Sequence, residues 1–149
     1  MQPAGAPGPL IRDARADDAG TIARLLGQLG YPSAADAVEE RLERLRVVGD
    51  RVVVAELDGN LVGLAHLQVT PAIERGRPVG KLGALVVDDE RRGLGIGTAL
   101  VEVVEAEARE RGCEVLFVTT SEQRDDAHAF YESVGFEQTG RRYSRTLSE

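Results

Sequence analysis

The chain has 149 residues, of which 42% are hydrophobic and 29% are charged, and its net charge is −7. These values predict one globular domain with a real hydrophobic core. The acidic balance argues against general nucleic-acid binding, which needs a basic face, and no apolar run is long enough to cross a bilayer. We therefore expect neither a nucleic-acid nor a membrane partner. The same charge is compatible with a cationic amine substrate or simply with solubility.

Cys113 is the single cysteine, so an internal disulfide is excluded and a reducing cytoplasm is favoured. We accordingly expect a cytoplasmic protein. Residues 1–9 are rich in Pro, Gly and Ala and lack the basic flank and apolar core of a signal peptide, so we expect a disordered tail. Residues 10–149 contain no linker and are expected to form one domain. No cluster of metal ligands stands out, and we expect no metal.

The first half of the chain predicts two helices and an antiparallel hairpin. Asp17 and Asp18 open the first helix, and Ser33 is the expected N-cap of the second. Asp58-Gly59 is the strongest short signal for a hairpin turn. The expected elements, in chain order, are a strand at 10–14, a helix from 16 to 29, a helix between 34 and 48, and strands at 51–57 and 60–70.

The second half alternates strands and helices before a final hairpin. The expected elements are a strand at 82–87, a helix at 98–111, a strand at 115–119, a helix at 125–134 and an antiparallel pair at 136–139 and 142–147. The whole order, β-α-α-β-β-β-α-β-α-β-β, predicts an α/β (α+β) fold with a mixed sheet and helices on both of its faces.

The most informative stretch joins the strand at 82–87 to the helix that follows. Residues 88–91 are charged and must leave the core, and 92–98 hold three glycines at alternate positions. Glycines before a helix N-terminus turn backbone N–H groups outward, which predicts an anion site suited to phosphates. A dinucleotide fingerprint would need Gly or Ala where Thr98 stands, and a P-loop would need Gly-Lys-Ser/Thr, which is absent.

Two motifs carry a resemblance to a known family. Arg92-Gly-Leu-Gly-Ile-Gly97 matches an Arg/Gln-x-x-Gly-x-Gly/Ala pyrophosphate loop, and Ala127-His-Ala-Phe-Tyr-Glu-Ser-Val-Gly-Phe136 matches an A-x-x-F-Y-E-x-x-G-F block. With the order of elements, they make the chain resemble the GNAT superfamily of acetyl-CoA-dependent N-acetyltransferases. The resemblance covers residues 10 to 147.

The resemblance implies an acyltransferase that uses acetyl-CoA as cosubstrate and no metal. It implies direct transfer, in a ternary complex, to a primary amine of a small molecule or peptide. The central sheet would be mostly antiparallel and splayed at a coenzyme cleft between the strands ending at Val87 and beginning at Val115. A bulge near Leu85 or Val86 would aim one N–H at the thioester carbonyl. The implied coenzyme-binding residues are Leu85, Val86, Val87, Arg92, Gly93, Leu94, Gly95, Ile96, Gly97, Thr98 and Arg124.

By the same resemblance, Tyr131 is the general acid. A tyrosine hydroxyl, with an ordinary pKa of about 10, can protonate a leaving thiolate whose parent thiol has a pKa of about 8.5. The alternative reading of Tyr131 is a core aromatic residue. Arg124 stands where the family often has asparagine, and it could bind coenzyme or substrate or cap a helix. Cys113 is expected to be a small buried residue, not a nucleophile.

The general base is left open. Relatives often carry a glutamate on the coenzyme-binding strand, and the corresponding position here is Gly83. The candidates that remain are Glu56, His66, His128 or solvent water alone. Because the general base is not identified, a second interpretation also stands: a non-catalytic acyl-CoA-binding or regulatory module on the same fold. A third interpretation is a nucleotide-binding protein outside the family. The acceptor is not specified, and a homodimer through the C-terminal strands is compatible with such a fold.

Overall fold

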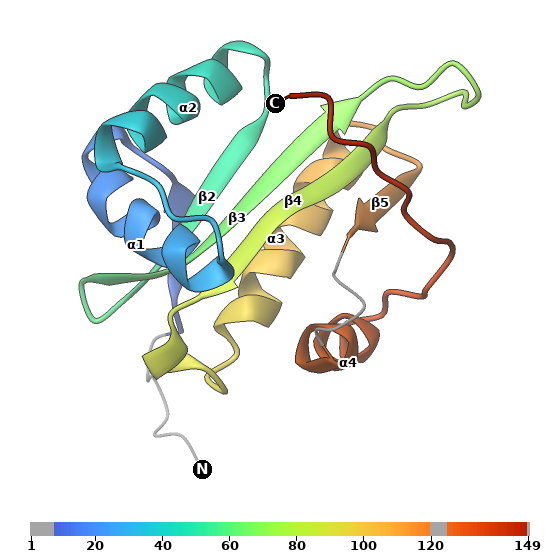
Figure 1. The fold of residues 1–149 in the computed structure, drawn as a ribbon. Coiled ribbons are helices and arrows are strands. Elements are labelled where there is room, and N and C mark those ends of the chain that lie inside the picture. The colour runs from blue at the N-terminus through green and yellow to red at the C-terminus, as the bar shows by residue number, and fades with distance from the viewer. Residues whose placement is uncertain (1–7, 120–124, 149) are drawn as a thin grey trace. The chain divides into compact units, whose positions relative to one another are not determined.

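The computed structural model describes residues 8–119 and 125–148. The chain forms two compact units that divide between Phe117 and Val118, and each is described by itself. Most of the tail predicted at 1–9 lies outside the described residues, as does Arg124. The elements are β1 Leu10–Asp13, a 3-10 helix Ala16–Asp18, α1 Ala19–Leu29, α2 Ala35–Val47, β2 Arg51–Leu57, β3 Asn60–Thr70, β4 Val79–Val87, a 3-10 helix Asp89–Arg91, α3 Ile96–Glu110, β5 Val115–Val118 and α4 Asp125–Ser133 (Figure 1).

The five strands form one open sheet in the order β1-β2-β3-β4-β5. The pairs β1–β2, β2–β3 and β3–β4 are antiparallel. Near the start of β4, the Glu114 N–H donates to the Pro78 carbonyl at 3.0 Å. The predicted fold class, a mixed and mostly antiparallel sheet with helices on both faces, is confirmed.

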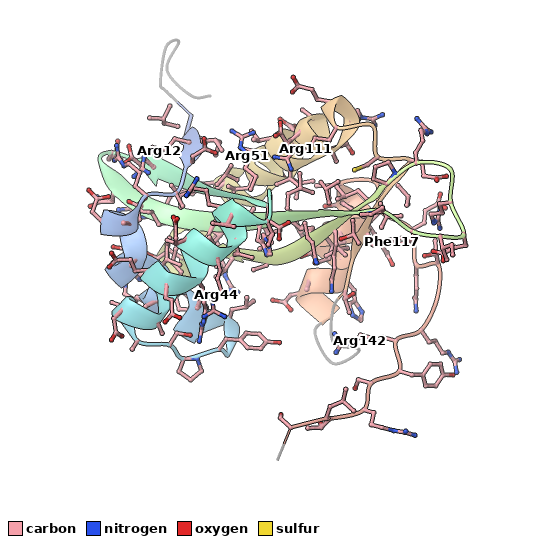
Figure 2. The ribbon with its side chains drawn as sticks, turned by 90° about the horizontal axis from the view of Figure 1, so that it is seen from above. Arg12, Arg44, Arg51, Arg111, Phe117 and Arg142 are labelled. Atoms are coloured by element: carbon pink, nitrogen blue, oxygen red, sulfur yellow. The ribbon has the colours of Figure 1, made fainter. Side chains whose placement is uncertain are left out.

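Helices cover both faces of the sheet. On one face, α1 and α2 pack on the strands through a cluster made of Ala19, Ile22, Leu25, Val38, Val54, Leu64 and Val86. On the other face, α3 buries Ile96, Leu100, Val101, Val104 and Ala108. Figure 2 shows α2, with Arg44, and the end of α3, with Arg111, on opposite sides of the strands. The residues of β2 to β4 that these helices bury are apolar on both faces, whereas Lys81 and Gly83 on β4 are exposed.

The hairpin at Asp58-Gly59 forms as predicted. Asp58 has φ 54° and Gly59 has φ 78°, the two positive values that a tight two-residue turn requires. The flanking strands, β2 and β3, have the bounds expected from the sequence. The turn therefore sets the register of the two central strands.

A β-bulge interrupts the pairing of β3 with β4. Ala65 pairs with Leu85 and Leu67 pairs with Leu82, so Gly83 and Ala84 both stand opposite His66. The extra residue keeps Leu82 and Leu85 on the same side of the sheet, where strict alternation would separate them. The bulge predicted near Leu85 or Val86 thus exists, but it lies directly before those residues.

Two helix starts differ from the prediction. Ala34, not Ser33, is the N-cap of α2, and the Ser33 hydroxyl donates to the Tyr31 carbonyl at 3.1 Å. The Ser33 side chain therefore stabilises the turn before α2 and does not cap the helix. Helix α3 begins at Ile96, two residues before the predicted start at Thr98, because Gly95 with φ 79° takes the cap position.

The predicted strand pair at 136–139 and 142–147 is wrong. Within the described residues 136–148 no strand forms, and residues 137–148 are all exposed. An isolated two-stranded hairpin is marginal in water unless a hydrophobic face packs. The alternating apolar and polar residues of this segment include too few apolar side chains to form such a face.

A partly buried ionic network joins β1 to the start of α1. The Arg12 guanidinium donates to Asp18 Oδ2 and Oδ1 at 2.8 and 2.9 Å and to Glu56 Oε1 at 2.9 and 2.7 Å. Asp18 also accepts the Arg15 N–H at 2.7 Å. The hydrogen bonds from Arg12, aided by that from Arg15, outweigh burial and hold the pKa of Asp18 below its ordinary value of 3.8.

We predict that Asp18→Asn lowers the unfolding free energy at neutral pH by about 2 kcal/mol, because charge-assisted hydrogen bonds are lost. A carboxylate with a depressed folded pKa stabilises the protein above its unfolded pKa, and this stability is lost as pH falls through the folded value. The deficit should therefore shrink when urea unfolding is repeated at pH values well below 3.8. Asp17→Asn, at an exposed carboxylate, is the control and should cost less than about 0.5 kcal/mol. A deficit independent of pH would contradict the assignment.

Candidate active site

Asp88 ends β4 and turns the chain out of the core. Its N–H donates to the Val62 carbonyl at 2.8 Å, which extends the sheet pairing by one bond. Its buried carboxylate accepts hydrogen bonds at 3.3 to 3.4 Å from the Glu90 N–H, Gln28 and Arg24. Burial opposes ionisation, but these hydrogen bonds outweigh it, so the pKa of Asp88 lies below its ordinary value of 3.8. Helix α1 thereby fixes the point where the glycine loop begins.

The glycine loop joins this point to α3. Gly93 and Gly95 have φ 80° and 79°, and a Cβ built on either would meet nothing within 4 Å. The loop surface is therefore open, and only glycine adopts this backbone without strain. The first intrahelical bond of α3 runs from the Ala99 N–H to the Gly95 carbonyl. Within the described chain, no side chain caps this helix. The N–H groups of its first residues are thus available to an anion.

The predicted coenzyme-binding residues form a continuous path through this unit. Leu85, Val86 and Val87 end β4, and residues 92–98 follow Asp88 and the short 3-10 helix. Val86 and Ile96 are buried in the core, so only their backbone can serve a ligand. Leu94 is exposed. The Arg92 guanidinium is half-exposed and pairs with Asp89 at 2.9 Å. Arg124 lies outside the described residues.

Tyr131 lies on α4 in the second unit. Its ring stands edge-on to Phe130 and Phe136, with centroids 5.3 and 5.7 Å apart. The Phe136 N–H donates to the Tyr131 carbonyl at 3.0 Å, after Gly135 ends the helix with φ 98°. The ring is held by aromatic packing and is only half-buried. This arrangement fits both a positioned acid and a core aromatic residue.

The three candidate bases stand in different environments. Glu56 Oε1 accepts two hydrogen bonds from Arg12, so its carboxylate is engaged in the network that fastens β1. His66 lies on β3, and its Nε2 is 2.9 Å from Asp50 Oδ2. His128 lies on α4 in the second unit and is half-buried. Asp50 was not a candidate from the sequence, because a lone acidic residue between a helix and a strand reads as a loop residue.

Two kinds of feature are absent from the described residues. Among them, no group of three or more His, Cys, Asp or Glu side chains is arranged to hold a metal ion. Nor does any described helix combine the length and apolar character needed to cross a membrane.

The sequence matches the model of the acetyltransferase (GNAT) family over residues 21–136. It is 35% identical over 138 residues to an aminoglycoside N(6')-acetyltransferase type 1 of Stenotrophomonas maltophilia, with 89% of each chain covered. It is 30% identical over 131 residues to a glucosamine 6-phosphate N-acetyltransferase of Trypanosoma brucei brucei, with 85% of this chain and 87% of the relative covered.

The fold is shared with solved structures. An aminoglycoside N-acetyltransferase in complex with CoA superposes with a TM-score of 0.84 at 22% identity, and the match covers 99% of this chain and 100% of that one. At this identity the likeness concerns the fold. The family match and the two curated relatives confirm the resemblance found in the motifs. The chain belongs to the acetyltransferase (GNAT) family and is an N-acetyltransferase.

Proposed function

We propose that residues 10–149 act as one acetyltransferase domain, which transfers the acetyl group of acetyl-CoA directly to a primary amine within a ternary complex. The observation that carries this proposal is the open glycine loop with positive φ at Gly93 and Gly95, placed between the end of β4 and the uncapped N-terminus of α3. The CoA bound by a solved protein of the same fold supports it.

In this proposal the coenzyme is held mainly by backbone. The N–H groups of residues 92–98 bind the pyrophosphate, where the helix dipole and the nearby Arg92 favour negative charge. The amides of the pantetheine arm extend the sheet along Leu85, Val86 and Val87. Backbone recognition agrees with the burial of Val86 and Ile96, whose side chains are committed to the core.

The chemistry follows from a thioester and a neutral amine. The amine nitrogen attacks the carbonyl carbon, and the carbonyl electron pair moves to oxygen, where a backbone N–H of the β4 end stabilises the oxyanion. Collapse of the tetrahedral intermediate breaks the carbon–sulfur bond. Tyr131 gives its proton to the departing thiolate, the nitrogen loses its extra proton to a base or to water, and Tyr131 regains a proton from solvent. The products are an N-acetylated acceptor and CoA.

The acceptor class we propose is a small amino sugar. Two relatives that align over most of their length are named for an aminoglycoside and for glucosamine 6-phosphate. The net charge of −7 suits a cationic aminoglycoside better than an anionic sugar phosphate.

A panel assay tests both the transfer and the acceptor. We expect release of free CoA thiol from acetyl-CoA with kanamycin, and slower release with glucosamine 6-phosphate or glycine. The readout is a thiol reagent, with mass spectrometry of the acetylated product. Binding of acetyl-CoA without turnover on any amine would instead favour the non-catalytic module, and affinity for ATP or NAD alone would favour a nucleotide-binding protein.

Tyr131→Phe removes the proposed acid while keeping the ring. We expect kcat to fall about 100-fold, the usual scale of a general acid, while the acetyl-CoA Kd stays within about threefold. Steady-state kinetics and calorimetry measure the two quantities. Tyr143→Phe removes the same hydroxyl from an exposed ring and is the control. Unchanged turnover in Tyr131→Phe would remove Tyr131 from the mechanism.

Gly95→Glu tests the loop. A glutamate strains the backbone at φ 79° and brings a negative charge to the pyrophosphate position. We therefore expect the affinity for acetyl-CoA, measured by calorimetry, to fall at least about 100-fold. Gly30→Glu is the matched control, because Gly30 has φ 102°, ends α1 and has open space around its Cβ position. It adds the same strain and charge elsewhere. Equal losses of affinity in both variants would defeat the loop assignment.

A further inference from the structure

His66 and Asp50 form a hydrogen-bonded pair on the face of the sheet that α1 and α2 cover. Nε2 of His66 lies 2.9 Å from Asp50 Oδ2. The Asp50 side chain is 7% exposed and that of His66 is 20% exposed. The carboxylate is thus withdrawn from water while the imidazole keeps an accessible edge.

The pair fixes the tautomer of the imidazole. An ionised carboxylate can only accept hydrogen bonds, so the ring nitrogen facing Asp50 carries the proton. Nδ1 is then left with a lone pair. His66 is therefore arranged as a proton acceptor at Nδ1, with its donor side occupied.

Nδ1 faces the bulge on β4. A Cβ built on Gly83 would lie 2.7 Å from Nδ1, closer than real Cβ contacts come, so the absence of a side chain at position 83 admits the ring. Gly83 is exposed, and with Ala84 it stands opposite His66 directly before the strand end at Leu85 to Val87. Nδ1 thus lies beside the exposed backbone of Gly83, two residues before Leu85, where the proposed coenzyme-binding segment begins.

Asp50 is itself held from two sides. Its N–H donates to the Leu45 carbonyl at 3.0 Å, at the end of α2. The carbonyl of the preceding Gly49 accepts a 2.6 Å hydrogen bond from Arg111, at the end of α3. Hydrogen bonds from the ends of α2 and α3 therefore hold the backbone at Gly49 and Asp50, which carries the carboxylate.

From this geometry we propose that His66 is the general base of the reaction and that Asp50 is its positioning residue. The inference rests on the proposed function. As the nitrogen–carbon bond forms, the proton of the attacking amine passes to Nδ1 of His66, and the carbonyl electron pair moves to oxygen. The imidazolium is stabilised by Asp50 and later releases its proton to water. The thiolate takes a separate proton from the acid.

The strands on either side of His66 carry few charged groups near it. Asp50 precedes β2, and Val52, paired with His66, is apolar. On β4, Lys81 pairs with Gln68 and is exposed. By strand alternation Lys81 and Gly83 lie on the same face. Of these charged groups, Asp50 is the one in direct contact with His66.

The test compares wild type, His66→Gln and Asp50→Asn with kanamycin or the best amine of the panel. We expect His66→Gln to lower kcat/KM about 100-fold, to remove the limb of the pH profile that reports the base, and to leave acetyl-CoA affinity within about threefold. Asp50→Asn should lower kcat less than His66→Gln does and leave KM for the amine within about threefold, because the imidazole stays in place but loses the carboxylate that orients it. A structural role would instead lower the melting temperature and leave the pH limb in place, and that result would overturn the proposal.

Gly83→Ala gives a second measurement with the histidine still present. Its Cβ would displace the imidazole, so we expect a loss of at least about tenfold in kcat with acetyl-CoA affinity retained. Gly20→Ala, on α1 with open space around its Cβ position, is the control and should keep full activity. Full activity in Gly83→Ala and His66→Gln would exclude His66 as the base while leaving the transferase function intact. Absence of turnover in wild type on every amine would instead defeat the proposed function, and the base with it.

Discussion

The antiparallel pairing of β3 with β4 is the interaction on which the rest of the molecule depends. Helices pack against both faces of these strands over part of their length, so the register decides which side chains reach α1 and α2 and which reach α3. A shift of one residue would exchange those two sets. The bulge at Gly83 and Ala84 is the one shift that this pairing contains, and it falls opposite His66. It changes the direction of β4 just before the segment assigned to the coenzyme.

The end of β4 meets a second constraint, which is the burial of Asp88. A buried carboxylate is tolerated only when it is hydrogen-bonded. Gln28 donates one of the hydrogen bonds that the Asp88 carboxylate accepts, and its amide oxygen accepts the Asp89 N–H at 2.9 Å. Helix α1 therefore does more than cover the sheet. It fixes the direction in which the glycine loop leaves the core, and hence where the N-terminus of α3 can meet an anion.

Local chemistry made most of the fold predictable. Asp58-Gly59 allows few conformations, so the bounds of β2 and β3 could be read from the sequence, and the stop glycines 30, 112 and 135 all adopt positive φ. The errors arose where tertiary context decides. Ser33 bonds backward to Tyr31 in place of capping α2, and the alternation at 136–147 had no apolar face to bury. Glu56 stays a candidate base, and its hydrogen bonds with Arg12 were not visible in the sequence because the two residues are far apart in the chain.

In the candidate site, too, the local motif could be predicted from the sequence and the contacts between distant segments could not. Its glycine loop is a continuous motif and was readable, whereas the environment of His66 is assembled from three separate segments. Asp50 is sixteen residues from His66, and Gly83 is seventeen residues beyond it. From the sequence alone, Gly83 indicates that the coenzyme-binding strand lacks the acidic residue often found there in relatives. In the fold, the missing side chain is what gives the imidazole its room. If His66 is the base, as proposed above, the basic group lies on β3 and not on β4, and a glycine at position 83 does not by itself argue for an inactive module.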